Sequence, residues 1–208
     1  LRQPTQHLSW RLRDAGYHCQ LVGIQHETVD LTTLGFHQTQ ELTHDNFSGG
    51  GIGVAARAAA FLADAATMEQ PFYLQVGLFE THTPWERWGC LPEDLSRAWL
   101  PSWTQASPDD AALLQKAAAL QGSLRRADDA VGMILAALRR AGLERDTIVP
   151  YTTDHGVELP RAKWTLLDPG IGVATILRWP GGGLTGGQVC QALTSNVDWL
   201  PTFCELAG

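Results

Sequence analysis

A carboxylate, an imidazole and an ammonium group follow one apolar run of this sequence. Asp154 and His155 come soon after the run Thr147–Val149, which is typical of a strand. Lys163 lies eight residues after His155. Because an aspartate oxygen can ligate calcium or magnesium and a lysine can offer positive charge to an oxyanion, this spacing predicts a catalytic site that handles an anion. His155 is either a second metal ligand or a donor to the anion.

A histidine also follows each of two other apolar runs. His26 follows the run at residues 19–23, and His82 follows the run at residues 72–78. Ligands of open α/β sheets bind beyond the carboxyl ends of the strands, so we expect both histidines to share one cleft with the Asp154–His155 pair. Their imidazoles can bind sulfate or phosphate oxygens, or protonate a leaving group.

Each of these residues also has an ordinary structural interpretation. Asp and Gly are common in loops, a single histidine is often a hydrogen-bonded loop residue, and a single lysine is usually a solvated surface charge. Four tryptophans raise the same choice, because they either cover a core or form an aromatic wall for a sugar or aryl group. They are Trp85, Trp88, Trp99 and Trp103.

The elements that must position these side chains alternate between helices and strands. We expect helices over residues 5–15, 54–66 and 107–140 and after Asp198, strands over 19–23, 72–78, 147–152 and 173–177, and a loop over 28–51. This order predicts an α/β fold with a mostly parallel sheet and helices on both faces. Pro150 falls inside the third expected strand, so that strand is an edge or contains a bulge. We expect Gly122 to loosen the long helix.

Composition restricts the class of protein and of partner. The chain has 208 residues, enough for one domain, and its net charge of −7 argues against nucleic acid as the main partner. No apolar run approaches the length of a membrane span. The four cysteines show no metal-binding spacing, so we expect free and mostly packed thiols. Compartment and oligomeric state are left open by the sequence.

Four motifs occur in order along nearly the whole chain. They are Leu12–Tyr17 with Gly23–His26, Pro71–Leu74 with Thr81–Pro84, Leu143–Val149 with Thr153–Gly156, and Val197–Thr202 with Leu206–Gly208. They are similar to L-x-x-x-G-Y…G-K-W-H, P-F-F-L…P-H-x-P, L-x-D-N-T-I-V…S-D-H-G and V-D-x-x-P-T…L-A-G. Together they resemble the sulfatase family of the alkaline phosphatase superfamily. In the third motif the Asp-Asn turn reads Arg145-Asp146, so that match is partial.

The resemblance implies a role for each candidate residue. Asp154 and His155 would hold a divalent cation, usually calcium in sulfatases. Lys163 and His82 would grip the sulfate oxygens and assist the leaving group, and His26 would lie beside the nucleophile. That nucleophile is a formylglycine made from Cys or Ser in a C/S-x-P-x-R motif, and its hydrated form attacks sulfur. The implied substrate is a small sulfated sugar or aryl sulfate.

The chain also departs from the family pattern. Only eleven residues precede Leu12, and none of them forms C/S-x-P-x-R. Ile24 occupies the position of the family lysine before the first histidine. We therefore expect residues 1–208 to be an incomplete, inactive, central and C-terminal part of an alkaline-phosphatase-like catalytic domain of a sulfuric ester hydrolase. The alternatives are a phosphodiesterase or phosphonate hydrolase of the same superfamily, and a degenerate module without catalysis.

Overall fold

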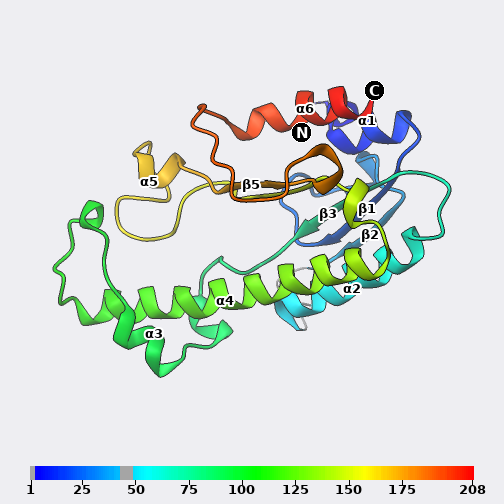
Figure 1. Ribbon diagram of the computed structural model, residues 1–208. Helices are drawn as coiled ribbons and strands as arrows, with labels where there is room; N and C mark the ends of the chain where they lie inside the picture. The colour runs from blue at the N-terminus through cyan, green and yellow to red at the C-terminus, as the bar shows by residue number, and fades with distance from the viewer. Residues whose placement is uncertain (1–2, 43–48) are drawn as a thin grey trace. The chain divides into compact units, whose positions relative to one another are not determined.

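The computed structural model describes residues 3–42 and 49–208 (Figure 1). The chain forms two compact units, which we describe separately. The first unit contains residues 1–79, 130–144 and 187–208, and the second contains residues 80–129 and 145–186. Part of the loop expected over 28–51, residues 43–48, lies outside the described residues.

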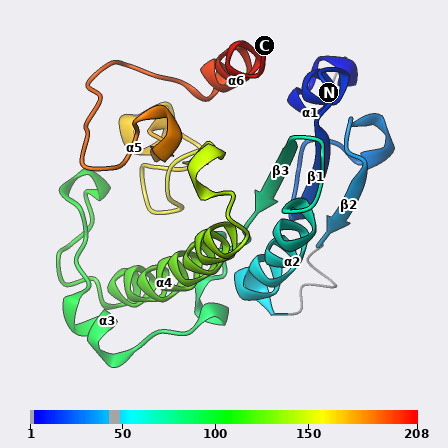
Figure 2. The same ribbon diagram turned by 45° about the vertical axis from the view of Figure 1, so that its right-hand side comes forward.

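The first unit is built on a parallel sheet of three strands. Its order is β2 (Gln38–Glu41), β1 (His18–Gly23) and β3 (Phe72–Gly77), with β1 in the middle (Figure 2). The expected parallel sheet and the strands expected over 19–23 and 72–78 are thus confirmed. The expectation of a loop is wrong over β2, which we missed because its sequence Gln-Thr-Gln-Glu is polar. Within residues 3–42 and 49–208 this strand pairs with β1 alone, and its residues are mostly exposed, so it needs no apolar pattern.

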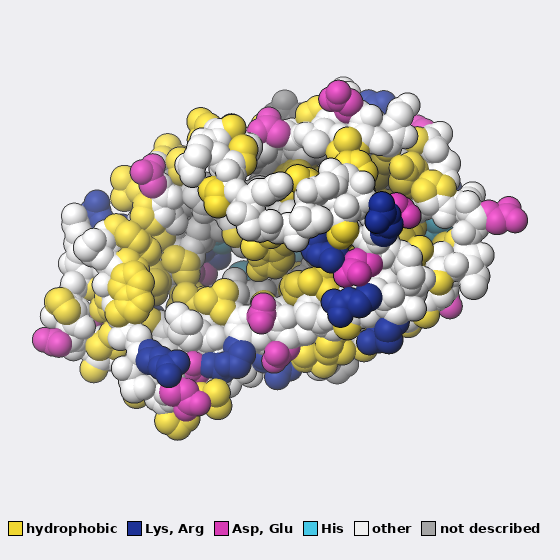
Figure 3. All heavy atoms as spheres, in the orientation of Figure 1, with side chains coloured by type: hydrophobic (Ala, Val, Ile, Leu, Met, Phe, Trp, Pro, Cys, Tyr) yellow, Lys and Arg dark blue, Asp and Glu magenta, His cyan; other side chains and the backbone are white. Residues whose placement is uncertain are grey.

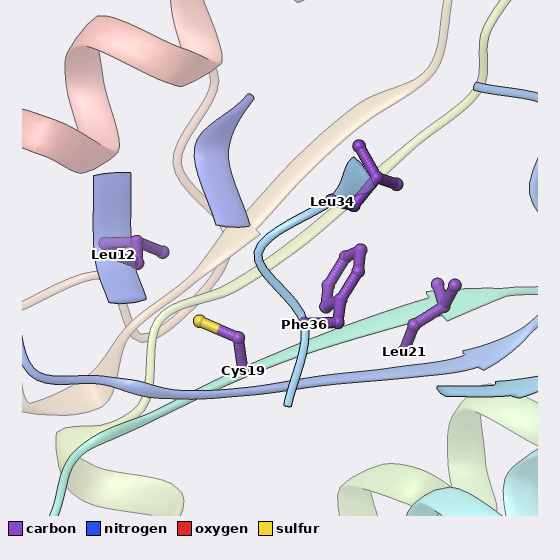
Figure 4. Close-up of a cluster of buried hydrophobic side chains, with 5 residues drawn as sticks. All are labelled: Leu12, Cys19, Leu21, Leu34 and Phe36. Atoms are coloured by element: carbon purple, nitrogen blue, oxygen red, sulfur yellow. The ribbon is translucent and has the colours of Figure 1, made fainter. Parts of the chain in front are cut away.

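One face of this sheet is covered by α1 (Leu8–Asp14), within the helix expected over 5–15. Side chains of a strand alternate between its two faces, so Cys19 and Leu21 of β1 point the same way. Both lie in one buried cluster that also contains Leu12 of α1, Leu34 and Phe36 (Figure 4). The last helix, α6 (Trp199–Ala207), contacts α1 (Figure 1).

The other face carries α2 (Gly50–Ala65), which begins four residues earlier than expected. Val22 of β1 packs there against Val54 of α2, and Leu42 completes the buried cluster. Both side chains of the Val22–Val54 contact are fully shielded from solvent. Consecutive residues of β1 therefore bury opposite faces of the sheet, as expected for a parallel strand with helices on both sides.

The second unit contains an antiparallel pair of strands, β4 (Val149–Thr152) and β5 (Thr175–Arg178). Both strands were expected, but their antiparallel pairing was not. The carboxyl ends of parallel strands meet at one edge of a sheet, and this argument applies to β1 and β3. It does not apply to β4, because β4 belongs to an antiparallel pair. Pro150 lies opposite Leu177, and β5 is the one strand that pairs with β4 in the described chain. With this one partner strand β4 is an edge strand, which is one of the two arrangements expected for Pro150.

The long helix α4 (Ala111–Arg140) begins later than expected from Ser107. The carboxylate of Asp110 accepts a hydrogen bond from the backbone of Leu113 and so caps the first turn. The helix continues through Gly122, so the expected loosening there is wrong. A Cβ on Gly122 would lie 1.6 Å from the carbonyl oxygen of Gly89, so this glycine permits close packing of two backbone segments.

Shorter elements complete the two units. They are η1 (Pro4–Gln6), η2 (Leu31–Thr33), η3 (Trp85–Trp88), α3 (Pro92–Arg97), η4 (Ser102–Thr104), η5 (Glu144–Asp146), α5 (Asp168–Ile171), η6 (Pro180–Gly182) and η7 (Asn196–Asp198). Asp198 was expected to cap the last helix, but its carboxylate accepts from the backbone of Ser195 and so caps η7. In the described part of the chain, no helix combines the length and apolar character that crossing a membrane requires.

Candidate anion-binding site

The loop after β4 carries three of the predicted site residues, and a close backbone contact holds it. Gly156 donates its N–H to the carbonyl of Gly170 at 2.9 Å. A Cβ at position 156 would lie 1.8 Å from the carbonyl oxygen of Pro169. The glycine of the Asp-His-Gly turn is therefore required by the approach of a second backbone segment.

Lys163 is held by its neighbours on both sides. Its backbone N–H donates to the carbonyl of Val157 at 3.0 Å. Arg161 and Trp164 both have positive φ, at 64° and 72°, a conformation that residues with a side chain seldom adopt. Because such conformations persist only where the surrounding structure enforces them, the backbone here is tightly determined. The Lys163 ammonium also lies 5.3 Å from the centre of the Trp164 ring.

The Lys163 ammonium binds a carboxylate that the sequence did not point to. Nζ donates to Oε2 of Glu158 at 2.8 Å, and only 11% of the lysine side chain is exposed, against 39% for the glutamate. The hydrogen bond from Lys163 is the largest influence that lowers the pKa of Glu158, and burial opposes it. A hydrogen bond with Thr83 and the charge of the His82 ring lower that pKa further.

The structure therefore brings together two predicted residues, His82 and Lys163, around the carboxylate of Glu158. His82 is exposed, and its Nδ1 lies 2.6 Å from the carbonyl oxygen of Thr83. A carbonyl oxygen only accepts, so Nδ1 carries the proton of this contact. The arrangement gathers an ammonium, an imidazole and a hydroxyl around one anionic group. Thr83 and Glu158 were missed, because no regular periodicity connects positions 83, 158 and 163.

Asp154 and His155 form a second pair in the same loop. Oδ2 of Asp154 lies 3.5 Å from Nε2 of His155, and the two side chains are 87% and 41% exposed. Nδ1 of His155 lies 2.7 Å from the carbonyl oxygen of Gly156, so Nδ1 carries a proton. A neutral ring then directs the lone pair of Nε2 toward the carboxylate, and a protonated ring forms an ion pair with it. A backbone carbonyl that holds the second nitrogen is the usual arrangement of a metal-ligating histidine.

His26 lies in the first unit, just beyond the end of β1. It is exposed, and it follows a turn in which Gln25 donates to Glu41 at 2.7 Å. Gly23 closes the strand with φ of 95°, and a Cβ there would lie 2.1 Å from the carbonyl oxygen of Gly77. Because the other four candidates belong to the second unit, the common cleft of all five remains a prediction.

The tryptophans divide between core and surface. Trp85 is 2% exposed and packs with Leu159, so it belongs to the core and cannot stack on a ligand. Trp99 is 67% exposed and lines a hollow of about 490 Å³ with Arg97 and the ion pair of Asp94 and Arg125. Figure 3 shows basic and acidic side chains mixed over α3 and the first part of α4. The aromatic wall expected from all four tryptophans is therefore wrong for Trp85.

Two described hollows have linings that do not include the charged cluster. The second, of about 330 Å³, is lined by Trp103, Arg161 and Asp168 among others. Neither lining includes His82, Asp154, His155 or Lys163. The hydrogen-bonded cluster is the stronger candidate, because an anion site is defined by converging donors and need not be a deep cavity.

Comparison with known proteins agrees with the motif pattern. The sulfatase family model matches residues 1–208. The chain belongs to the sulfatase family. It is 28% identical over 159 residues to N-sulphoglucosamine sulphohydrolase of Homo sapiens, covering 66% of this chain and 31% of the relative. It is 29% identical over 172 residues to Arylsulfatase A of Homo sapiens, covering 75% and 30%. This sulfatase-family chain thus spans about 30% of the length of these relatives.

Solved structures support the same fold. A Bacteroides thetaiotaomicron protein of glycosaminoglycan metabolism matches with a TM-score of 0.75 and 17% identity, covering all of this chain and 54% of its own. The phosphonate monoester hydrolase of Agrobacterium radiobacter matches with a TM-score of 0.70 and 18% identity, covering 97% and 58%. The alkaline-phosphatase-like α/β fold expected for this sulfatase-family chain is confirmed.

Sulfatases generally use a divalent metal and a formylglycine. Asp154 and His155 are suitable ligand types and lie close together, but no group of three His, Cys, Asp or Glu that would suit a metal gathers within residues 3–42 and 49–208. A calcium ion takes six to eight oxygen ligands, so this pair fits part of such a site.

The cysteines of this family member are all free, as expected, but they are less packed than expected. Cys19 is buried, whereas Cys90 and Cys190 are exposed. Cys90 is followed by Pro92 in the manner of the nucleophile motif, but Asp94 stands where that motif has arginine. Asp94 forms an ion pair with Arg125. The described cysteines therefore do not fit the family's formylglycine.

Proposed function

We propose that the protein to which this chain belongs is a metal-dependent sulfuric ester hydrolase, and that residues 1–208 form the central and C-terminal part of its catalytic domain. One observation carries the proposal: Lys163, His82 and Thr83 already surround an anionic oxygen group, the carboxylate of Glu158. Membership of the sulfatase family supports a sulfate ester as the anion. The substrate would be a small sulfated sugar or an aryl sulfate.

Each residue of the cluster has a distinct task in this proposal. Lys163 binds a sulfate oxygen and offsets the negative charge that develops there. His82 holds a proton for the leaving-group oxygen, and its Nδ1 contact with the carbonyl of Thr83 fixes the ring so that Nε2 can deliver it. Asp154 and His155 provide two ligands for a divalent cation, which we expect to be calcium. Bound calcium would supply further positive charge to the sulfate oxygens, and a formylglycine would supply the nucleophile. His26 would lie beside that nucleophile.

The test is hydrolysis of nitrophenyl sulfate by the purified full-length protein, with calcium and with a chelator. We expect Lys163→Ala and His82→Ala each to lower kcat/KM by roughly 10²–10⁴-fold, the range for loss of a general acid or of one oxyanion donor. Glu69→Gln is the control, because Glu69 is exposed in the turn after α2. Full activity of the Lys163→Ala protein would end the proposal.

A second hydrolase activity is favoured by two observations. Ile24 occupies the position of a family lysine, and phosphonate monoester hydrolases share the fold. The protein would then be a phosphodiesterase or phosphonate hydrolase of the same superfamily. Parallel assays with nitrophenyl sulfate and bis-nitrophenyl phosphate discriminate, because the preferred ester shows directly in the ratio of kcat/KM values.

For the 208 residues taken alone we propose that turnover is absent. None of their cysteines or serines lies in C/S-x-P-x-R, and Cys90 comes nearest with Asp94 in the arginine position. The 208 residues would then be a degenerate or incomplete module that at most binds an ion or a sugar. Hydrolysis of nitrophenyl sulfate by the 208-residue chain in the presence of calcium tests this, and measurable turnover would overturn the proposal. Calorimetric titration with calcium shows separately whether the chain keeps the ion site.

A further inference from the structure

The partner of Lys163 has no role in the hydrolysis described above. Glu158 accepts a hydrogen bond from Nζ of Lys163 at 2.8 Å, and its carboxylate also meets the Thr83 hydroxyl and the charge of the His82 ring. A carboxylate is not needed to hold a substrate anion, and its negative charge repels such an anion. Two of the three groups that converge on Glu158, Lys163 and His82, are those that our proposed function assigns to the substrate.

We propose that Glu158 is a specificity-determining residue that makes the site select singly charged anions over doubly charged ones. Its carboxylate cancels the charge of Lys163, so that an incoming ligand meets a nearly neutral pair. A sulfate monoester carries one negative charge, whereas a phosphate monoester carries up to two. This inference rests on the proposed function, because it takes Lys163 as the group that binds the ester's oxygens.

The charge of the ligand determines how strongly Glu158 acts. A carboxylate about 4 Å from a single charge in a water-like medium costs about fivefold in affinity, equivalent to about 1 kcal/mol. The water-like value applies because 39% of the Glu158 side chain is exposed. Since the repulsion energy doubles for a dianion, the same carboxylate lowers the affinity for a dianion about 25-fold. Removing the charge should therefore change the ratio of the two affinities by about fivefold.

A purely structural role for Glu158 makes a different prediction. If the carboxylate only positions Lys163, then Glu158→Gln keeps the size of the side chain and an oxygen that accepts from Nζ. The affinity for both kinds of anion would then stay the same or fall together. The ratio of the two affinities is thus the quantity that separates charge selection from positioning.

The experiment compares two ligands of one shape and different charge. Phenylsulfonate and phenylphosphonate are titrated calorimetrically into the full-length protein, at a pH at which the phosphonate is dianionic. The proteins are the wild type, Glu158→Gln, Lys163→Ala and the control Glu69→Gln, which removes one exposed carboxylate elsewhere. We expect Glu158→Gln to strengthen sulfonate binding about fivefold and phosphonate binding about 25-fold, and we expect Glu69→Gln to leave the ratio unchanged.

Two results overturn the inference in distinguishable ways. If Lys163→Ala abolishes binding but Glu158→Gln leaves the ratio unchanged, then Glu158 does not select by charge and the proposed function stands. If Lys163→Ala leaves the binding of both ligands intact, or if neither ligand binds the wild type, then Lys163 is not the anion-binding group. That second result refutes the proposed function and the inference together.

Discussion

The close contact of Gly156 gives the sharpest test of how this chain holds its charged loop. Replacing Gly156 by alanine adds a Cβ that would lie 1.8 Å from the carbonyl oxygen of Pro169. Real Cβ atoms do not approach that closely, so the backbone at 156 or at 169 must move. The movement breaks the 2.9 Å hydrogen bond between Gly156 and Gly170. The lost hydrogen bond and the overpacking together destabilise the protein by roughly 2–5 kcal/mol.

The assay is urea unfolding of the Gly156→Ala protein, together with its kcat/KM for nitrophenyl sulfate. Gly132→Ala is the matched control, because a Cβ at Gly132 meets nothing within 4 Å and the position lies inside α4. We expect Gly132→Ala to stabilise the protein by about 0.5–1 kcal/mol. Because the displaced loop carries Asp154, His155 and Lys163, Gly156→Ala should also lower kcat/KM by roughly 10²-fold.

A small effect would refute this reasoning. If Gly156→Ala unfolds within 0.5 kcal/mol of the wild type, the approach of the segment at 169–170 does not constrain the loop. If stability falls but kcat/KM does not, the contact supports the fold without positioning the charged side chains.

Three further predictions concern other parts of the chain. Trp85→Ala should cost about 3–5 kcal/mol in urea unfolding because Trp85 is a core residue, whereas Trp99→Ala should stay within about 0.5 kcal/mol, and equal losses would contradict the division. The pKa of Glu158 is lowered on folding, so its ion pair stabilises the protein above the ordinary carboxyl pKa of 4.5, and this stability is lost as the pH falls below that value. The Tm of Glu158→Gln should therefore fall less steeply with acid than that of the wild type, and parallel curves would exclude the pair. Burial raises the pKa of the Cys19 thiol to about 11, so iodoacetamide at pH 8 should label exposed Cys90 and spare Cys19, as peptide mass spectrometry would show.

The parts of the fold that are predictable from sequence are those with an apolar pattern. The run at 19–23 was expected as a strand of a mostly parallel sheet, and the structure places it in the middle of that sheet, buried on both faces. Strand β2 does not, because Gln38–Glu41 is polar and its pairing depends on the register with β1 rather than on its own side chains. Both β4 and β5 were expected, but their antiparallel pairing was missed, because strand direction is a tertiary property that local sequence does not determine.

The candidate site was predictable only as a set of residue types. The motifs gave His82, Lys163 and the Asp154–His155 pair, and the structure places the first two around one carboxylate. Glu158 was missed, because it lies in a loop whose geometry is set by positive φ at Arg161 and Trp164 and by contacts with distant segments. Such loop geometry leaves no periodic trace in a sequence.

The two charged pairs of the second unit share one loop, and this sharing links the cation and the anion of the proposed reaction. Asp154 and His155 precede the Gly156 contact, and Glu158 and Lys163 follow it. A cation bound by Asp154 and His155 would therefore lie on the same backbone segment that carries Glu158 and Lys163. Because that backbone is fixed by the hydrogen bond from Gly156 to Gly170, the two pairs can keep a constant separation while each exchanges its own ligand. In the proposed site, the Gly156 contact would therefore position both pairs, and the Asp-His-Gly turn would be more than a flexible connection.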